Sequence, residues 1–387
     1  MAADRWAESG AMALTGWPDG PPLHPGRAIP ARLDRLVCAI SRAGGPAVDW
    51  GPLVSGRAAI LGLRRQGRVS ANGSCRLLRA RDGWVALNMA RPTDWDMVPA
   101  LIGGPAGGWD ALEDSVAARR ADEFVSWART LALPAAVVGE RRAAEPPWTA
   151  AAVWPRADRG RPLEAMVVVD LSALWAGPLT ARLLGAAGAE VVKVESVSRP
   201  DTARSTPGFY GWLHPADQQV VPLDFSSPDG RARLKRTLER ADVVIEASRP
   251  RALEQLGAAP ADLAGRPGRV WLSITGHGRS SPYRDRVAFG DDAAAAGGLV
   301  AWDGAGSPVF CADAIADPIT GLFGALAVLH AVRDGGGVLI DLPMAGCAAA
   351  VAAAEGRGPA PAARPVAGGW AVGTTEVRQP RTPPPLP

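Results

Sequence analysis

The sequence predicts an α/β fold, in which helices cover a mostly parallel sheet, and three observations lead to it. Between residues 166 and 342, apolar runs of strand length alternate with segments of helical length. The runs are apolar throughout, which is typical of strands that are buried on both faces of a parallel sheet. Glycine and proline mark the ends of these segments, as at 335–337.

The first part of this pattern predicts three strands. The run 166–169 is the first of them, and the Ala-Gly-Pro turn at 176–178 begins a helix that continues to about residue 184. Further strands are expected at 191–194 and 220–225. The order strand, helix, strand is that of a βαβ unit.

The second part begins at Ser227-Pro228-Asp229, which combines a helix N-cap, a proline at the first helical position and an acid in the first turn. This signal predicts a helix through residue 240. Two more buried strands are expected at 243–245 and 270–274, and a last helix at about 318–333 leads to a strand at 338–342. We therefore expect a Rossmann-like large α/β domain over residues 164–354.

The residues before this domain have a different pattern. Apolar pairs on either side of Asp82-Gly83 indicate a hairpin, and helical stretches follow at 95–102 and 121–130. We therefore expect a smaller α+β domain at 57–140, N-terminal to the large one. The Pro-rich segment 141–163 is expected to be a linker, and the Pro/Ala/Gly-rich tail 355–387 to be disordered.

Residues 1–56 carry a weak echo of the large domain. Ser9–Ala13, Asp19-Gly20 and 28–31 run parallel to 297–301, Asp303-Gly304 and 314–317. This N-terminal segment is therefore interpreted as a candidate remnant of a duplicated large domain. Ala31 stands in the first copy where Asp317 stands in the second.

Composition excludes several classes of function. The chain has 42 basic and 39 acidic residues, and the basic ones are dispersed, so no nucleic acid partner is expected. The four cysteines lie far apart without metal-ligand spacing, so we expect neither a metal site nor a disulfide framework. Asp4 and Glu8 argue against a signal peptide, and no apolar run approaches the length of a membrane span, so we expect a cytoplasmic protein with no membrane contact. A P-loop, a GxSxG elbow and a GxGxxG turn after a strand are all missing, which makes a nicotinamide-dependent oxidoreductase a poor alternative.

Six segments, in their order and spacing, resemble the family III CoA-transferases, the group of formyl-CoA transferase, carnitine CoA-transferase and α-methylacyl-CoA racemase. The resemblance covers about residues 165–345. In that family the small domain follows the strand-rich part, so this chain resembles a rearranged or partly duplicated member. The segments are 167–196, 200–204, 221–234, 241–257, 272–282 and 314–326.

The resemblance implies transfer of CoA between carboxylic acids, in which an aspartate attacks the thioester to give a mixed anhydride and then an aspartyl-CoA. The matching residue is Asp317, in the segment AIADPITG. An aspartate before Pro318 is also a common helix start. Both roles are compatible, because a helix N-terminus favours an ionised carboxylate.

The resemblance also implies binding residues for the acyl-CoA. The turn Trp175-Ala176-Gly177-Pro178 matches the loop beside the thioester, and it is alternatively an ordinary helix start. Trp175 stands where some relatives carry a polar residue, which indicates an apolar or aromatic acyl group. The other implied binding residues are Arg199 and Arg204, which suit phosphate or a solvated surface, Asp291, which suits a reacting group or a helix cap, and Gly298.

Departures from the family pattern keep alternatives open. Glu246-Ala247-Ser248 replaces a Glu-Asn-Phe sequence, and the stretch 289–292 lacks the histidine of the racemase branch, while His277 lies in a neighbouring loop. The prediction is a CoA-transferase, with an acyl-CoA racemase or isomerase and a non-catalytic CoA-binding subunit as alternatives. A CoA thioester is expected as substrate with a carboxylic acid as acceptor, and no permanently bound cofactor is expected. The chain is expected to form a homodimer, alternatively with a related subunit.

Overall fold

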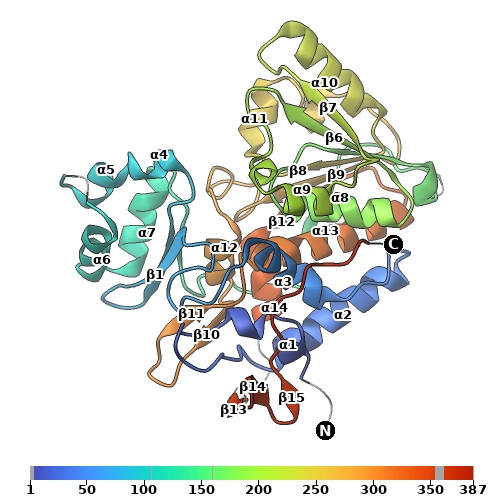
Figure 1. The fold of residues 1–387 in the computed structure, drawn as a ribbon. Helices are drawn as coiled ribbons and strands as arrows, with labels where there is room; N and C mark the ends of the chain where they lie inside the picture. The colour runs from blue at the N-terminus through green and yellow to red at the C-terminus, as the bar shows by residue number, and fades with distance from the viewer. Residues whose placement is uncertain (1–3, 106, 159, 354–360, 387) are drawn as a thin grey trace.

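The computed structural model describes residues 4–105, 107–158, 160–353 and 361–386. Its centre is a seven-stranded sheet in the order β4-β12-β9-β8-β5-β6-β7 (Figure 1). Every neighbouring pair is parallel except β4 and β12, so the predicted mostly parallel sheet is confirmed. The strands are β4 (Thr149–Ala152), β5 (Val167–Asp170), β6 (Glu190–Ser196), β7 (Gln219–Leu223), β8 (Val243–Glu246), β9 (Val270–Thr275) and β12 (Val338–Pro343).

Side chains alternate between the two faces of this sheet, and each face has its own core. Val168 and Ile245 belong to the core formed with α8 (Ala176–Ala186) and α13 (Ala316–Arg333). Val169 and Val244 belong to the core formed with α10 (Pro228–Arg240) and α11 (Pro250–Gln255) on the other face (Figure 1). Across the ranges described above, no helix is long and apolar enough to cross a membrane.

The N-terminal residues complete the core on the α13 side of the sheet. They form α1 (Arg5–Glu8), α2 (Ala28–Arg42) and α3 (Trp50–Leu61), and α2 packs on α13 and on α14 (Met344–Ala352). Trp6, Leu33 and Trp50 are fully buried in this shared core. The segment 1–56 is thus part of the large domain's packing, and its origin by duplication stays a prediction.

From Cys75 on, the segment predicted as a small domain has its own sheet and core, whereas its first residues, 57–61, belong to α3 and pack in the core of the large domain. Its antiparallel strands are β1 (Cys75–Arg79), β2 (Trp84–Asn88) and β3 (Ala135–Val137), and its helices are α4 (Pro92–Trp95), α5 (Val98–Ile102), α6 (Trp109–Ala117) and α7 (Ala121–Thr130). Strands β2 and β3 contact α12 (Gly290–Ala296) of the large domain. The segment between α12 and α13 folds as a hairpin of β10 (Val300–Trp302) and β11 (Pro308–Phe310).

Two segments differ from their predicted state. The predicted linker 141–163 contributes β4, because its backbone pairs with β12 although its side chains are exposed. Residues 361–386 lie in the predicted disordered tail but form β13 (Arg364–Val366), β14 (Gly369–Val372) and β15 (Thr375–Glu376). Arg378 N donates to Ala7 O at 2.9 Å, and Leu386 is buried against the main core, so tertiary contacts stabilise a segment whose composition alone favours disorder. The rest of that tail, 355–360 and Pro387, lies outside the described residues.

Candidate active site

Asp317 lines a pocket of about 180 Å³ at the carboxyl ends of the parallel strands. In open α/β sheets this edge is where ligands bind. Asp317 is the one carboxylate among the described residues that line the pocket. Loops after β5, β8 and β9 supply most of the wall, and its members are Ala173, Leu174, Ala176, Ala247, Ser248, Arg249, Pro250, Ile274, Thr275, Gly276, Arg284, Arg286, Val287, Ala288, Phe289, Asp317 and Met344.

Asp317 reaches the pocket because α13 packs closely on α8. A Cβ added at Gly321 would lie 2.9 Å from Ala176 O, and one added at Gly324 would overlap the side chain of Thr180. Thr180 Oγ1 instead donates to Gly321 O at 3.1 Å. Only glycine permits this approach of the two backbones. The first turn of α13 therefore lies beside the loop that joins β5 to α8.

The side chain of Asp317 is partly buried and faces the pocket. Among the described residues, none donates a hydrogen bond to its oxygens. Burial raises the pKa of Asp317 to about 8, Arg57 opposes that rise, and the carboxyl groups of Asp291 and Asp313 add to it. The side chain therefore keeps its proton to a higher pH than an ordinary aspartate does.

Three more aspartates are buried beside Asp317. Asp291 accepts from Asn72 Nδ2 at 3.1 Å and from Ala314 N at 3.0 Å. Asp292 accepts from Asn88 Nδ2 and Phe289 N, both at 2.9 Å. Burial raises the pKa of Asp291 and of Asp292 to about 7 in each case. We call Asp291, Asp292, Asp313 and Asp317 the aspartate cluster.

Arg57 from α3 brings a positive charge to the aspartate cluster. Its Nη1 lies 2.9 and 2.8 Å from the two carboxylate oxygens of Asp313. Its guanidinium also lies over the rings of Trp175 and Phe209, at 5.7 and 5.8 Å from their centroids. Burial raises the pKa of Asp313, and Arg57 opposes that rise. Helix α3 thus contributes directly to the surroundings of Asp317.

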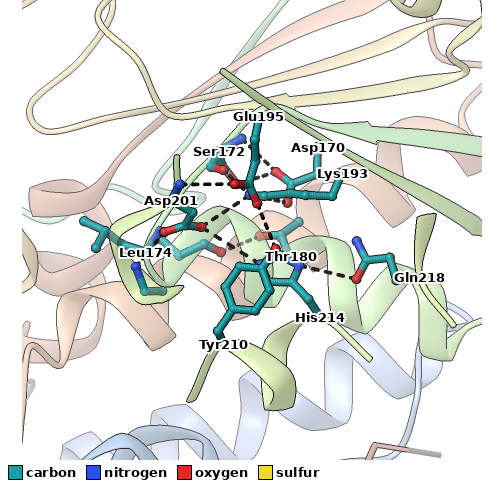
Figure 2. A network of polar contacts seen from close by, with 12 residues as sticks. Asp170, Ser172, Leu174, Thr180, Lys193, Glu195, Asp201, Tyr210, His214 and Gln218 are labelled. Atoms are coloured by element: carbon teal, nitrogen blue, oxygen red, sulfur yellow. Dashed lines mark hydrogen bonds and ion pairs between the residues drawn. The ribbon is translucent and has the colours of Figure 1, made fainter. Parts of the chain in front are cut away.

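A second group of charges holds the loop between β5 and α8, which forms part of the pocket wall (Figure 2). Lys193 Nζ lies 3.3 Å from Asp170 Oδ2 and 3.5 Å from Asp201 Oδ2, and it donates to the carbonyl of Ser172. Asp201 Oδ1 accepts from Leu174 N at 3.0 Å. We call Asp170, Lys193, Glu195, Asp201, Arg204 and Tyr210 the Lys193 network.

The structure places some of the predicted turn residues on the pocket wall and others behind it. Ala176 lines the pocket. Trp175 is buried behind the wall, where its ring packs edge-on against Phe209 at 5.3 Å. Gly177 and Pro178 are buried in the first turn of α8, and a Cβ at Gly177 would clash with Ser172. The turn thus contributes its backbone more than its tryptophan.

The remaining predicted residues lie around the pocket at different depths. Asp291 is buried in the aspartate cluster and does not line the pocket, and Gly298 follows α12 and faces Gly139. Arg204 donates to Glu195 and to Tyr210 Oη, so its charge is already paired. Arg199 is exposed. Burial is the main cause that lowers the pKa of Arg249, and the nearby charge of Arg199 lowers it further.

Sequence reasoning missed several residues of this site. Arg249, Arg284 and Arg286 line the pocket, and Arg91 and Arg251 also act on the pKa of Arg249. A usable signal existed for Arg249 alone, since it follows the predicted strand 243–245 by only a few residues and so belongs to the pocket edge. Arg57, Asn72 and Asn88 precede the predicted large domain and carry no such signal.

The described residues offer neither a histidine on the pocket wall nor a group of three or more His, Cys, Asp or Glu arranged for a metal ion. His277 is buried nearby, and burial together with Arg129 and Arg286 lowers its pKa to about 3. It is therefore neutral at physiological pH.

Comparison with known proteins shows which proteins this chain is similar to. Succinyl-CoA–D-citramalate CoA-transferase of Chloroflexus aurantiacus is 33% identical over 196 residues, which cover 47% of this chain and 49% of that protein. The beta subunit of succinyl-CoA–L-malate CoA-transferase from the same organism is 36% identical over 183 residues, 44% of this chain and 45% of that protein. Probable CoA-transferase Rv1866 of Mycobacterium tuberculosis is 30% identical over 277 residues, 65% of this chain and 33% of that protein. The chain spans about half the length of the first two relatives.

Among solved structures, a CAIB/BAIF family protein from Brucella suis is 26% identical with a TM-score of 0.47, covering 55% of this chain and 65% of that chain. The family model "CoA-transferase family III" matches residues 163–369, a region that holds all the parallel strands of the sheet, the pocket wall and Asp317. More than half of the sequence thus carries the family's pattern, and this protein belongs to CoA-transferase family III.

Proposed function

We propose that this chain transfers CoA between carboxylic acids and that Asp317 is the acyl acceptor. The observation that carries the proposal is the position of Asp317, the one carboxylate on the described wall of a pocket at the ligand-binding edge of the sheet. Family membership supports the reaction class. Because the chain covers about half of its curated relatives, the activity of this chain by itself is part of the proposal.

The proposed reaction has four steps. The Asp317 carboxylate attacks the thioester carbonyl, a C–O bond forms, the C–S bond breaks, and CoA leaves as a thiolate. The thiolate then attacks the aspartyl carbonyl of the mixed anhydride, which releases the first acid and leaves an aspartyl-CoA thioester. The second acid attacks this thioester, giving a new anhydride and CoA thiolate. Attack of the thiolate on the new acyl carbonyl completes the transfer and restores Asp317.

The surroundings of Asp317 suit this role. Its place in the first turn of α13 favours the ionised form, whereas burial keeps the carboxylate basic. A basic carboxylate is a better nucleophile than an ordinary one once it loses its proton. Because the pKa of Asp317 is about 8, we expect the transfer rate to rise with pH up to about that value.

Arginines around the pocket support binding of CoA. Arg284 on the pocket wall is already paired with both carboxylate oxygens of Glu254, at 2.7 and 3.0 Å. Arg249 and Arg286 line the pocket without such an ion pair among the described residues, and their guanidinium groups match the geometry of phosphate. Of the two predicted phosphate ligands, Arg199 is exposed beside Arg249, whereas Arg204 is paired with Glu195. We therefore propose Arg199 with these pocket arginines as the binding surface for the CoA phosphates. The acids that donate and accept CoA stay open, and the named relatives make succinyl-CoA the first donor to test.

A non-catalytic CoA-binding subunit is the second candidate. Two observations favour it: the chain spans about half the length of its curated relatives, and those relatives include alpha and beta subunits. A racemase is less well supported, because the described pocket wall carries no histidine that could act as a second base. The predicted homodimer and the cytoplasmic location stay predictions.

Covalent labelling tests the proposal. The chain is incubated with radiolabelled succinyl-CoA, and the labelled peptide is identified by mass spectrometry. We expect label at Asp317 that hydroxylamine removes, since both anhydrides and thioesters react with it. Asp317→Asn preserves the size of the side chain, so we expect a normal melting temperature and a loss of transfer of roughly a thousand-fold or more. The matched control is Asp110→Asn on the exposed face of α6, which should keep both label and activity.

Full transfer by Asp317→Asn would remove Asp317 from the role of acyl acceptor. Binding of succinyl-CoA without label or turnover, both alone and with a related subunit, would favour the CoA-binding subunit. Exchange of solvent deuterium into the α-carbon without an acceptor acid would favour the racemase.

A further inference from the structure

The backbone that leads into α13 is strained on both sides of Asp313. Ala312 and Ala314 have φ values of +55° and +43°, in the left-handed region that residues other than glycine rarely adopt. Such conformations persist only where surrounding contacts fix them, and they are concentrated at functional sites. This loop immediately precedes Asp317, so its conformation determines where the carboxylate points.

Three side chains from other parts of the molecule hold this loop. Thr15 Oγ1 accepts from Ala312 N at 3.1 Å, and Asp291 Oδ1 accepts from Ala314 N at 3.0 Å. Between these two bonds, Arg57 pairs with both oxygens of Asp313, whose side chain is fully buried. Thr15 and Arg57 lie outside residues 163–369, the part of the chain that carries the family's pattern.

Arg57 is itself held in one place. Its guanidinium lies against the rings of Trp175 and Phe209, and only 21% of its side chain is exposed. Both rings belong to the buried core, which prevents the side chain from moving out to solvent. The contact with Trp175 also joins Arg57 to the turn before α8, so one residue contacts both this turn and the loop before α13.

We infer that Arg57 is a positioning residue for Asp317: through Asp313 it fixes the strained loop before α13, and it brings a positive charge into the aspartate cluster. The inference rests on the proposed role of Asp317 and assigns a task in the reaction to helix α3. Arg57 does not line the pocket, so it acts through Asp313 and through its electric field.

The charges that face Asp317 come from several elements. Asp291 and Asp292 of α12 and Asp313 of the preceding loop are negative when ionised, and Arg57 of α3 is positive. Arg249, Arg284 and Arg286 stand on the pocket wall. Arg57 lowers the pKa of Asp317, whereas Asp313 raises it. Removal of these two partners should therefore change the pKa of Asp317 in opposite directions, which a general loss of structure would not do.

The test measures the protonation of Asp317 in the wild type and in two variants. Infrared difference spectra between each protein and its Asp317→Asn derivative report the carboxyl of Asp317 as a function of pH, and they need no activity. We expect Arg57→Met to raise the pKa of Asp317 by about one unit or more and Asp313→Asn to lower it. The rising limb of the transfer rate should move in the same two directions.

Arg65→Met is the matched control. Arg65 is also a part-buried arginine and lies shortly after α3, but its hydrogen bonds go to the carbonyls of Ala13, Trp17 and Gly20. Its removal should leave the pKa of Asp317 unchanged. Arg57→Lys, which keeps the charge but not the two-pronged contact, should leave that pKa near its original value and lower kcat. If Arg57→Met does not fold, Arg57→Gln takes its place, because it also removes the charge while keeping a polar side chain.

The inference is wrong if the pKa of Asp317 is the same in the wild type, Arg57→Met and Asp313→Asn. Its failure is separable from that of the proposed function. Full activity of Asp317→Asn would overturn the role of Asp317 as nucleophile. The infrared titrations would still show whether Arg57 changes the pKa of Asp317. If transfer requires Asp317 but the infrared titrations of wild type and variants are the same, only the role of Arg57 is overturned.

Discussion

The aspartate cluster and the Lys193 network both hold buried carboxylates beside the parallel sheet, but they differ in their balance of charge. In the Lys193 network, Asp170, Glu195 and Asp201 have Lys193 and Arg204 as cationic partners. In the aspartate cluster, four carboxyl groups have one arginine within the cluster, and it is paired with Asp313. Three acids thus share two cations in the Lys193 network, whereas four carboxyl groups share one cation in the aspartate cluster.

The pKa values show the consequence. Burial by itself would raise the pKa of Glu195, but hydrogen bonds from Arg204 and Tyr210 hold it at about 2. Burial without such donors raises the pKa of Asp317 to about 8. Cations and hydrogen-bond donors lower the pKa of a buried carboxylate, whereas a buried carboxylate that lacks them keeps a raised pKa. The two clusters therefore differ in pKa according to the number of their cations and hydrogen-bond donors, and three experiments can test this difference.

The largest effect is expected from removal of the cation in the Lys193 network. Lys193→Met leaves Asp170 and Asp201 buried beside an apolar side chain, which should lower the free energy of unfolding by about 3–5 kcal/mol. Urea unfolding at pH 7 measures this value. The second of the chain's two lysines, Lys235, is exposed on α10, and Lys235→Met should change the same quantity by less than about 0.5 kcal/mol. Equal effects of the two substitutions would mean that Lys193 does not neutralise the network.

A smaller effect with a defined pH dependence is expected in the aspartate cluster. The pKa of Asp292 is about 7 in the folded chain, above its ordinary value of 3.8 in the unfolded chain. The folded state therefore binds more protons than the unfolded state between these values, and its stability decreases as pH rises through this window. Asp292→Asn has no carboxyl group at this position and so does not lose this stability. The free energy of unfolding of the variant, relative to that of the wild type, should therefore increase by about 2 kcal/mol from pH 5 to pH 8. Urea unfolding at the two pH values measures the change, and a difference that is independent of pH would contradict the raised pKa.

The smallest effect is expected at the exposed edge of the Lys193 network. The Arg204 side chain is 43% exposed, so Arg204→Met should lower the free energy of unfolding by about 1 kcal/mol or less at pH 7. Because the pKa of Glu195 is lowered to about 2, its contribution is complete above pH 4.5 and is lost as pH falls toward 2. The difference between variant and wild type should therefore shrink in acid, as thermal unfolding from pH 7 to pH 3 can show. Arg199→Met, at the neighbouring exposed arginine, is the control and should leave stability unchanged at both pH values.

Much of the fold could be predicted from the sequence. Continuous apolar runs predicted β5, β8, β9 and β12, and the helix signal at Ser227 predicted α10. These features depend on residues close together in the chain, where periodicity and capping carry the information. The antiparallel strand β4 was missed, because its exposed, Ala-rich residues have no pattern apart from the backbone pairing with β12.

The candidate site also has a part that the sequence predicts and a part that only the packing decides. Asp317 and the turn at 175–178 lie in local motifs, and the sequence alone pointed to both. Whether a motif residue faces the pocket was decided by packing: Ala176 lines it, whereas Trp175 lies behind it against Phe209. Local patterns state which residues are adjacent in the chain, but side-chain direction depends on what packs against each face.

Only the tertiary structure decided which charges surround Asp317. Arg57 and Asp313 are 256 residues apart, and Asn72 and Asp291 are 219 apart. Pairs at such separation meet because the N-terminal helices and the small domain pack on α12 and α13, and no local pattern encodes that contact. The sequence thus determined the nucleophile candidate and the sheet that carries it, and the fold determined its pKa, because burial and distant charges set the free energy of an ionised carboxylate.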